Sequence, residues 1–268
     1  MNETLEAMAR AFFKSWFVDF DPVRSKIEGR KPFGVDADTA ALFPDSFQDS
    51  PLGKIPKGWS LTTLGKHVDS TRGLSYTGSG LSDSGVPLHN LNSVNEGGGS
   101  KYEGIKYYVG EYEERHKVQA GEIIVTNTEQ GFDFLLIGFP AMIPRRFGPW
   151  GIFSHHLYRV RLQPSSPLRT QFLYWLLMSD KVRAQIIACT NGTTVNMLPP
   201  DGLVRPHFAL PPEGLINHFE QLSLPLTERI ETNNEESRTI AAIRDACLPK
   251  LISGEVRVMG RRDPVGAP

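Results

Sequence analysis

The chain has 268 residues, of which 40% are hydrophobic, and its formal net charge is −1 at pH 7. This length suits one domain of ordinary size with appended segments. The two cysteines, Cys189 and Cys247, are isolated, which excludes a disulfide framework and favours a reducing compartment. No apolar run reaches membrane-spanning length, and Glu3 and Glu6 replace the basic start of a signal peptide. We expect a soluble protein of the cytoplasm, with no membrane partner.

Residues 2–20 have the pattern of an amphipathic helix, with apolar side chains at intervals of three and four. The stripe consists of Leu5, Met8, Phe12, Trp16 and Phe20, widened by Ala9, Phe13 and Phe17. Asp21-Pro22 is expected to end this helix, because the residue before a proline avoids the helical region. Residues 21–57 are rich in proline and indicate a connector with one short helix near residues 38–42.

Residues 58–211 have the composition of a globular domain. Strand-like runs cover residues 86–90, 122–127, 135–139 and 157–162, punctuated by glycine and proline. One helix with a buried stripe is predicted over residues 169–187. The regular strand–helix alternation of a doubly wound sheet is missing. We therefore predict an α/β (α+β) fold in which one curved, mixed or mostly antiparallel sheet domain is flanked by helices.

A long C-terminal helix is predicted after Leu210-Pro211-Pro212. Five residues within it are spaced by seven, as in a weak coiled coil, and Leu222 and Ile243 occupy the companion position. The five are Phe219, Leu226, Asn233, Ile240 and Cys247. Pro225 predicts a late start or a kink. The helix could pack on its own domain, but we favour pairing with residues 2–20 or with another subunit. Residues 259–268 are expected to form a disordered tail.

Charge is segregated along the chain. Residues 141–183 hold seven Lys or Arg and one Asp, a net charge of +6, whereas residues 213–245 hold three Arg and seven acids, a net charge of −4. The basic segment predicts attraction to phosphates, and the acidic helix predicts contact with another protein. A solvated surface with chance clustering is the alternative.

Several catalytic signatures are missing from the sequence. It has no glycine-rich phosphate loop, no Asn-Pro-Pro-aromatic motif, no glycine-rich cofactor fingerprint and no carboxylate cluster followed by Glu-x-Lys. His155 and His156 would point to opposite faces of a strand, which disfavours a shared metal. Ser154 and His155 lack a third group for nucleophilic catalysis. We predict a binding module with no catalytic residue, metal or cofactor.

At several places the chain resembles the specificity subunit of Type I restriction–modification systems, in particular its C-terminal half. Residues 2–9 and 14–23 are similar to the end of the family's central helical region. Residues 41–47 and Ile55-Pro56-Lys57-Gly58-Trp59 are similar to its lead into the second target-recognition domain. Residues 120–125, 154–156 and 191–198 are similar to motifs inside such domains. The resemblance covers nearly all of residues 2–258.

The resemblance implies a non-catalytic subunit that recognises a specific DNA sequence. Family members read the two halves of a split site with two recognition domains, which two antiparallel helices hold apart while docking methyltransferase subunits. Methylation and ATP-driven cleavage belong to partner subunits, so an endonuclease and translocase subunit is an indirect partner. The implied segments are the central helix (1–20), connector (21–57), target-recognition domain (58–211), distal helical region (212–258) and tail (259–268).

This chain departs from the family plan because it has one recognition domain. Two copies paired head to tail, or a complementary half-subunit, would restore a two-domain reader. A dimer of that kind would read a palindromic split site in double-stranded DNA.

Three loops are rich in groups suited to DNA. Gln130 and Asn127 are expected to read bases, with Arg145, Arg146 and Tyr76 at phosphates or bases. The DNA-contacting set is Arg72, Ser75, Tyr76, Asn127, Thr128, Gln130, Arg145, Arg146, His155, His156, Asn191, Thr193 and Thr194. The helix-pairing set is Leu5, Met8, Phe12, Trp16, Phe219, Leu222, Leu226, Asn233 and Ile240.

Structural alternatives stay open for these residues. Tyr76 could be a core aromatic, and Asn127 a turn residue that bonds backbone. The two arginines could be an exposed pair without partners, and Asn191-Gly192 a tight turn.

A second class of function is an assembly or decoy protein that binds methyltransferase subunits without reading DNA productively. The short first helix favours this class, whereas the intact recognition domain favours DNA reading. An independent nuclease is disfavoured by the missing metal carboxylates.

Overall fold

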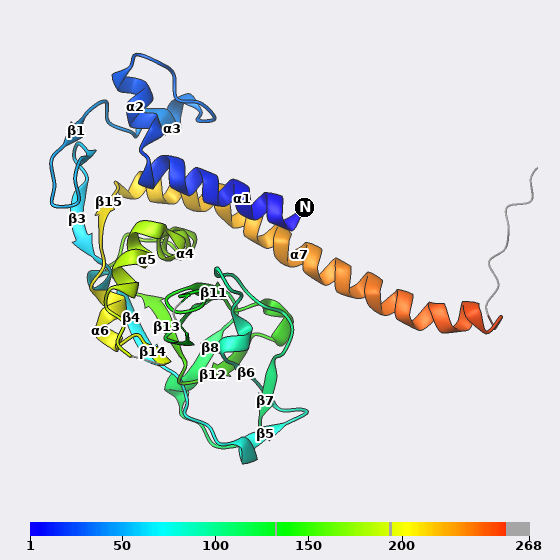
Figure 1. The fold of residues 1–268 in the computed structure, drawn as a ribbon. Coiled ribbons are helices and arrows are strands. Elements are labelled where there is room, and N and C mark those ends of the chain that lie inside the picture. The colour runs from blue at the N-terminus through cyan, green and yellow to red at the C-terminus, as the bar shows by residue number, and fades with distance from the viewer. Residues whose placement is uncertain (132, 193–194, 256–268) are drawn as a thin grey trace, which may run out of the picture.

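The computed structural model describes residues 1–131, 133–192 and 195–255. Two antiparallel helices lie side by side along one side of the molecule, α1 (Asn2–Phe13) and α7 (Glu213–Ile252), as Figure 1 shows. α1 continues into a π-helical turn, η1 (Lys14–Val18). Phe20 then adopts a left-handed conformation, with φ of 59°, and turns the chain into the connector. The predicted pairing of the first and last helices is therefore confirmed within one chain.

The connector is ordered and packs on the core. It contains α2 (Asp21–Ile27), α3 (Ala37–Ala41) and the hairpin of β1 (Phe47–Gln48) with β2 (Ile55–Pro56). The expected short helix is α3, which Asp36 caps by accepting a hydrogen bond from the Thr39 amide at 2.9 Å. α2 was not predicted. Pro22 ends one helix but also starts the next, because proline is tolerated in a helix's first turn.

Two larger sheets form the domain, so the mixed fold class is confirmed but the single expected sheet is divided. The first has the order β11-β9-β13-β4 and is antiparallel throughout. The second has the order β5-β7-β6-β12-β8 and is mixed, because β12 pairs parallel with β6 and antiparallel with β8. Their strands are β4 (Val68–Arg72), β5 (Leu81–Ser82), β6 (Val86–His89), β7 (Lys106–Tyr108), β8 (Lys117–Gln119), β9 (Ile123–Thr126), β11 (Pro140–Met142), β12 (Trp150–Phe153) and β13 (Leu157–Leu162).

Two further strand pairs complete the domain. β3 (Ser60–Thr63) pairs with β15 (His207–Leu210), so the segments that enter and leave the domain lie together. β10 (Thr128–Gln130) pairs with β14 (Val195–Met197). The helices are α4 (Thr170–Met178), α5 (Asp180–Ile187) and α6 (Pro200–Val204), with short 3-10 turns at Leu64–Lys66, Gly78–Gly80, Leu91–Ser93, Glu114–His116 and Arg145–Phe147.

Three predicted elements differ from the structure. Residues 135–139 form a turn and not a strand, because the carboxylate of Glu129 binds its backbone amides. The helix expected over residues 169–187 is two helices, divided at Ser179, whose ψ of 136° is extended. α7 begins at Glu213 and runs through Pro225, so the late start was wrong. Phe219 and Ser223, in the turns before this proline, are fully buried.

One large hydrophobic core joins the helix pair, the connector and the sheet domain. Phe13 lies 5.5 Å from Phe219 of α7, and Phe17 lies 4.9 Å from Phe172 of α4, between ring centroids. Trp16 contacts Phe43 of the connector at 5.5 Å. Such aromatic pairs stabilise beyond the area that they bury. Among the described helices, none is both long enough and apolar enough to cross a membrane.

Candidate nucleic-acid interface

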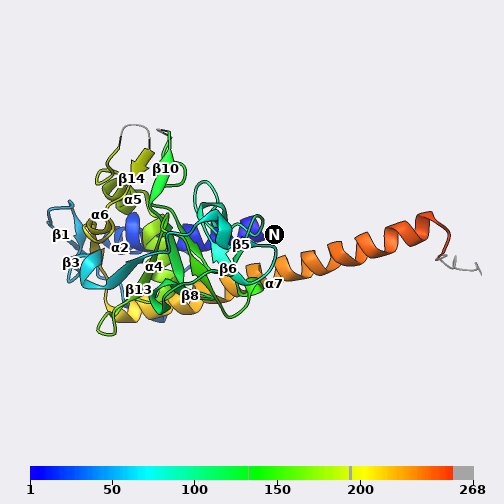
Figure 2. The same ribbon diagram turned by 90° about the horizontal axis from the view of Figure 1, so that it is seen from below.

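The strand pair β10–β14, here called the ribbon, projects from the domain, as Figure 2 shows. Its register places Thr128 opposite Met197 and Gln130 opposite Val195. Opposed residues of an antiparallel pair share a face, and successive residues alternate between faces. Thr128, Gln130, Val195 and Met197 therefore share one face, called the outer face of the ribbon.

Hydrogen bonds of the ribbon's inner face join it to residues 135–137 and brace the ribbon itself. Glu129 is buried and accepts from the amides of Leu135, Leu136 and Ile137 at 2.7, 3.0 and 2.8 Å. Asn196 is also buried, and its side-chain amide donates to the Gly131 carbonyl. A carboxylate that accepts several backbone amides in a buried place fixes local geometry firmly. The inner face of the ribbon is thus anchored. On the outer face Gln130, Val195 and Met197 are exposed, whereas Thr128, also a predicted DNA contact, is only 4% exposed.

Asn127 lies at the base of the ribbon and is 1% exposed. Its backbone amide donates to the His156 carbonyl at 2.9 Å, and its side-chain amide donates to the His155 carbonyl at 3.0 Å. Its own carbonyl accepts from the Leu198 amide at 2.8 Å. As the alternative interpretation expected, Asn127 bonds backbone, although the backbone belongs to other segments. The structure places it inside the protein, not on a surface open to bases.

The two histidines lie in a turn and not in a strand, so the argument that they face opposite sides does not apply. Their rings lie against each other with centroids 3.9 Å apart and planes tilted by 40°. Burial, and then the nearby His155 and Arg72, lower the pKa of His156, whose Nδ1 lies 2.8 Å from the Thr128 hydroxyl. The described residues contain no group of three or more His, Cys, Asp or Glu placed to hold a metal.

Several predicted DNA contacts gather beside the ribbon's outer face. Gln130, Arg72 and Asn191 are exposed. Arg72 donates from Nε to the His155 carbonyl at 3.0 Å. Asn191 exchanges two backbone hydrogen bonds with Met197, at 2.8 and 2.7 Å. A hollow of about 400 Å³ beside the ribbon is lined by Arg72, Tyr158, Asn191, Gly192, Val195, Met197, Leu198, Pro199 and Pro200. Thr193 and Thr194, also predicted contacts, lie outside the described residues.

The sequence did not point to Val195 and Met197 as candidate site residues. They are 41% and 42% exposed, whereas Asn196 between them is 5% exposed. The alternation of apolar and polar residues in Val195-Asn196-Met197 was the available signal for a strand. Without the fold, however, the apolar side would have been assigned to the core.

Tyr76 and Ser75 lie in the loop after β4. Tyr76 is half-buried, packs edge-on against Tyr108 at 6.2 Å, and receives the Lys106 ammonium 5.9 Å from its ring, while Ser75 is exposed. Gly73 was expected to let the backbone approach a phosphate. A Cβ there would instead lie 2.3 Å from the carbonyl oxygens of Phe153 and Ser154, so glycine permits close packing on the protein's own backbone.

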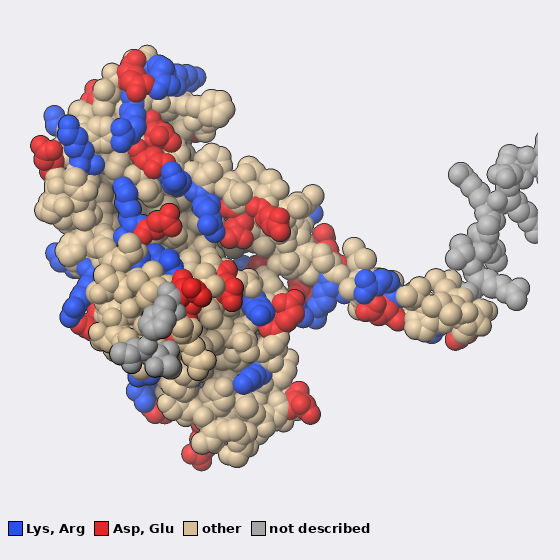
Figure 3. Space-filling model, in the orientation of Figure 1, with Lys and Arg blue, Asp and Glu red and all other residues tan. Residues whose placement is uncertain are grey.

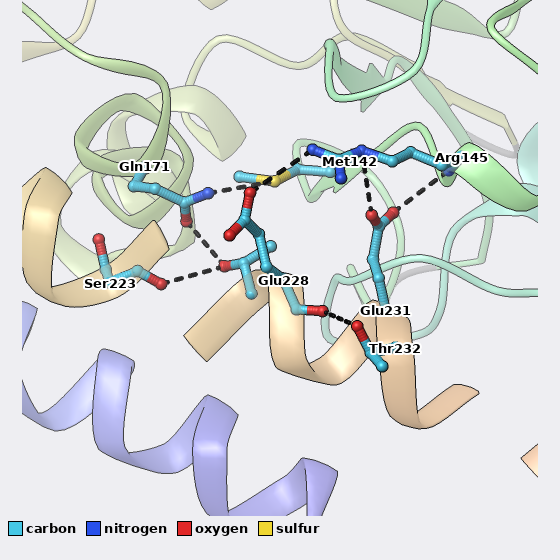
Figure 4. Close-up of polar contacts among 8 residues, drawn as sticks. Met142, Arg145, Gln171, Ser223, Glu228, Glu231 and Thr232 are labelled. Atoms are coloured by element: carbon cyan, nitrogen blue, oxygen red, sulfur yellow. Dashed lines mark hydrogen bonds and ion pairs between the residues drawn. The ribbon is translucent and has the colours of Figure 1, made fainter. Parts of the chain in front are cut away.

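Arg145 connects the sheet domain to α7, whereas Arg146 packs on aromatic rings within the domain. The Arg145 guanidinium pairs with Glu228 at 3.7 Å and Glu231 at 3.5 Å, and its backbone amide donates to Glu231 at 3.2 Å (Figure 4). The Arg146 guanidinium lies over the rings of Tyr102 and Phe147, at 5.8 and 5.4 Å. The alternative of an exposed pair without partners is therefore wrong.

Most of the basic segment has internal partners. Arg161 pairs with Glu122, Arg169 pairs with Glu213 at 2.9 Å, Arg159 donates to the Lys117 carbonyl, Lys181 donates to the Val18 carbonyl at 3.2 Å, and Arg183 donates to the Phe134 carbonyl. Figure 3 shows cations and acids intermixed on the face that it presents. The charge of +6 therefore does not measure the charge available to phosphates.

The interface of α1 with α7 is centred on buried aromatic residues. Trp16 and Phe219 are buried, and Leu5, Phe12, Leu222 and Leu226 are partly buried. Asn233 donates to Asn2 at 2.7 Å, and Asn2 donates to Asn234 at 2.7 Å. Met8, in the middle of α1, is 43% exposed. Ile240 is 67% exposed, since α7 continues past the first residue of α1 (Figure 1).

Similar proteins place the fold in context. No protein-family model matches the chain. It is 24% identical over 261 residues to the Type I restriction enzyme MjaIX specificity subunit of Methanocaldococcus jannaschii, covering 96% of this chain and 54% of that protein. It is 23% identical over 304 residues to the Type I restriction enzyme HindI specificity subunit of Haemophilus influenzae, covering 96% and 62%. The chain thus spans little more than half the length of these relatives.

A solved structure has a similar fold. The crystal structure of a Type I restriction–modification S subunit from M. genitalium matches with a TM-score of 0.52 at 16% identity, over 73% of this chain and 46% of that one. At that identity the match supports the architecture.

Proposed function

This chain is a relative of the Type I restriction enzyme specificity subunits, and we propose that it is a non-catalytic subunit that reads one half of a split DNA site and docks methyltransferase subunits. The observation that carries the proposal is the antiparallel pair of α1 and α7 attached to a single mixed-sheet domain. One shared core fixes the helix pair to that domain. A reader and a docking element would therefore move as one body.

The ribbon supplies the DNA-reading element of this proposal. A two-stranded β-ribbon is narrow enough to enter the major groove of B-DNA. Gln130 stands exposed on the outer face, and its amide can pair with the donor and acceptor of adenine. Arg72 and Asn191 line the hollow beside the ribbon, where they can reach phosphates and fix the register.

The distal part of α7 supplies a surface for assembly with a second chain. α1 begins beside Asn233 and Asn234, and α7 extends to Ile252 beyond them. Five aliphatic residues along this extension are exposed: Ile240 (67%), Ile243 (57%), Leu248 (50%), Leu251 (40%) and Ile252 (79%). An apolar surface of this kind is typical of a protein–protein interface. We propose that a second copy of the chain or a complementary half-subunit covers it, giving a two-domain reader.

The test is co-expression with the cognate methyltransferase subunit, followed by mass determination and mapping of methylated sites. We expect a complex with two copies of this chain that methylates a palindromic split site. The variant Ile240→Glu/Ile243→Glu should lose the second copy, whereas Glu236→Gln on the same helix should retain it. A single copy at micromolar concentration in the complex would contradict the self-paired reader.

The assembly or decoy function remains the second candidate. The observation that favours it is that most cations of residues 141–183 have internal partners, which leaves fewer for phosphates. In the same experiment, a complex that forms but methylates no site would support it over DNA reading.

A further inference from the structure

We infer that Val195 and Met197 recognise the 5-methyl group of thymine in the major groove, so that the ribbon selects an A·T base pair. The inference rests on the proposed function and adds two specificity-determining residues to it. Both side chains lie on the outer face, beside Gln130 and Thr128.

The polarity of the ribbon is the reverse of an ordinary half-buried sheet. Such sheets bury apolar residues and expose polar ones. Here Glu129 and Asn196 are buried at 7% and 5% exposure, while Val195 and Met197 are 41% and 42% exposed. The buried polar pair is explained by its hydrogen bonds to Gly131 and to residues 135–137. The exposed apolar pair has no comparable role within the described part of the fold.

Single exposed apolar residues are common on protein surfaces, so exposure alone would carry no argument. The outer face combines two aliphatic side chains with one amide, and Val195 stands directly opposite Gln130. An A·T pair presents the matching groups along one groove edge, namely the acceptor and donor of adenine and the methyl group of thymine. Among the four bases, thymine alone carries an apolar group on that edge.

The surroundings of the pair also suit an anionic duplex. The hollow beside Val195 and Met197 is lined by Arg72 and Asn191, and its described lining residues include no acid. Glu129 and Asn127 anchor the ribbon through hydrogen bonds, which would reduce the side-chain and backbone order that has to be gained on binding.

The experiment uses the full chain, alone and with the methyltransferase subunit, to select duplexes from a randomised library. The enriched duplex is then resynthesised with uracil in place of each thymine in turn, which removes only the methyl group. For the wild-type protein we expect uracil to weaken binding about fourfold at one or two positions, the effect of burying one methyl group.

Val195→Ala and Met197→Ala should bind the thymine duplex more weakly and lose the difference between thymine and uracil. Val109→Ala provides the matched control, because Val109 is 64% exposed and lies outside the ribbon. It should keep the difference. Unchanged thermal unfolding of the variants would exclude a folding defect as the cause.

The outcomes separate the two proposals. Sequence-specific binding that is equal for thymine and uracil at every position would overturn the reading of the methyl group and leave the proposed function standing. If both alanine variants still bind thymine more tightly than uracil, other residues contact the methyl group, and the inference about Val195 and Met197 is also overturned. If no sequence is enriched in either form of the protein, DNA reading itself fails, and this inference fails with it.

Discussion

Asn127 and Gln130 were predicted together as base readers, but they occupy opposite environments. Asn127 is buried and bonds the backbone of residues 155 and 156, whereas Gln130 is exposed on the ribbon. We expect Asn127→Ala to lower the free energy of unfolding by about 0.5–1.5 kcal/mol, because the His155 carbonyl loses one of its two side-chain donors. Gln130→Ala should change it by less than about 0.5 kcal/mol. Urea unfolding of both variants measures this, and equal effects would contradict the assignment.

His89 predicts a pH dependence of stability. It is 1% exposed, and burial lowers its pKa to about 4. Its folded pKa lies below the unfolded value near 6.5, so its stabilising contribution is complete above that value and is lost as pH falls toward 4. We expect a loss of about 2 kcal/mol from this residue between pH 7 and pH 5.

This prediction is tested by the change of the free energy of unfolding with pH, and not by the absolute stability. His89→Phe should be unfolded by urea with a smaller pH dependence than the wild type. His67, His116 and His156, whose pKa values burial also lowers, should supply the dependence that remains. An unchanged slope in the variant would show that His89 does not titrate in this way.

At the scale of the element, α7 has two halves with different environments. Phe219 is fully buried and packs between Phe13, Phe17 and Trp16. Ile240, three heptads along the same helix, is 67% exposed. We expect Phe219→Ala to cost about 3–5 kcal/mol of stability. Ile240→Ala should cost less than about 0.5 kcal/mol in the isolated chain. Denaturant midpoints test the contrast, and similar costs would mean that the distal half is covered in solution.

The regular heptad spacing in α7 predicted a helix but not its environment. Phe219, Leu226 and Asn233 face α1 or the domain, while Ile240 and Cys247 follow the same spacing and are exposed. Phe13 of α1 and Phe17 of the π-helical turn are also buried, although the predicted stripe had treated both as its margin. Periodicity identifies a side of a helix, and only the partner's length decides which turns of that side are buried.

At the scale of the whole molecule, the charge available to bind DNA depends on the contacts of each cation and not on the net charge of its segment. Arg145 pairs with α7, whereas Arg72 stands beside the ribbon. We expect Arg72→Ala to reduce the salt dependence of DNA binding by about one unit of log K against log salt. Arg145→Ala should leave that slope unchanged. DNA binding measured between low and moderate salt provides the test. A smaller salt dependence for Arg145→Ala would indicate that the DNA interface includes the region beside α7.

The sequence alone determined that a helix lies at each end of the chain, the strands β6, β9 and β13, and the resemblance to specificity subunits. Periodicity and local motifs are properties of neighbouring residues, so they can be recognised without the fold. It could not place Asn127, Arg145 or Gly73, whose partners lie 28 or more residues away. Residues 135–139 have the composition of a strand but form a turn, because their backbone amides donate to the buried carboxylate of Glu129. Tertiary structure decided which polar groups bond within the protein, and thereby which side chains stay exposed at the ribbon, where we propose that DNA binds.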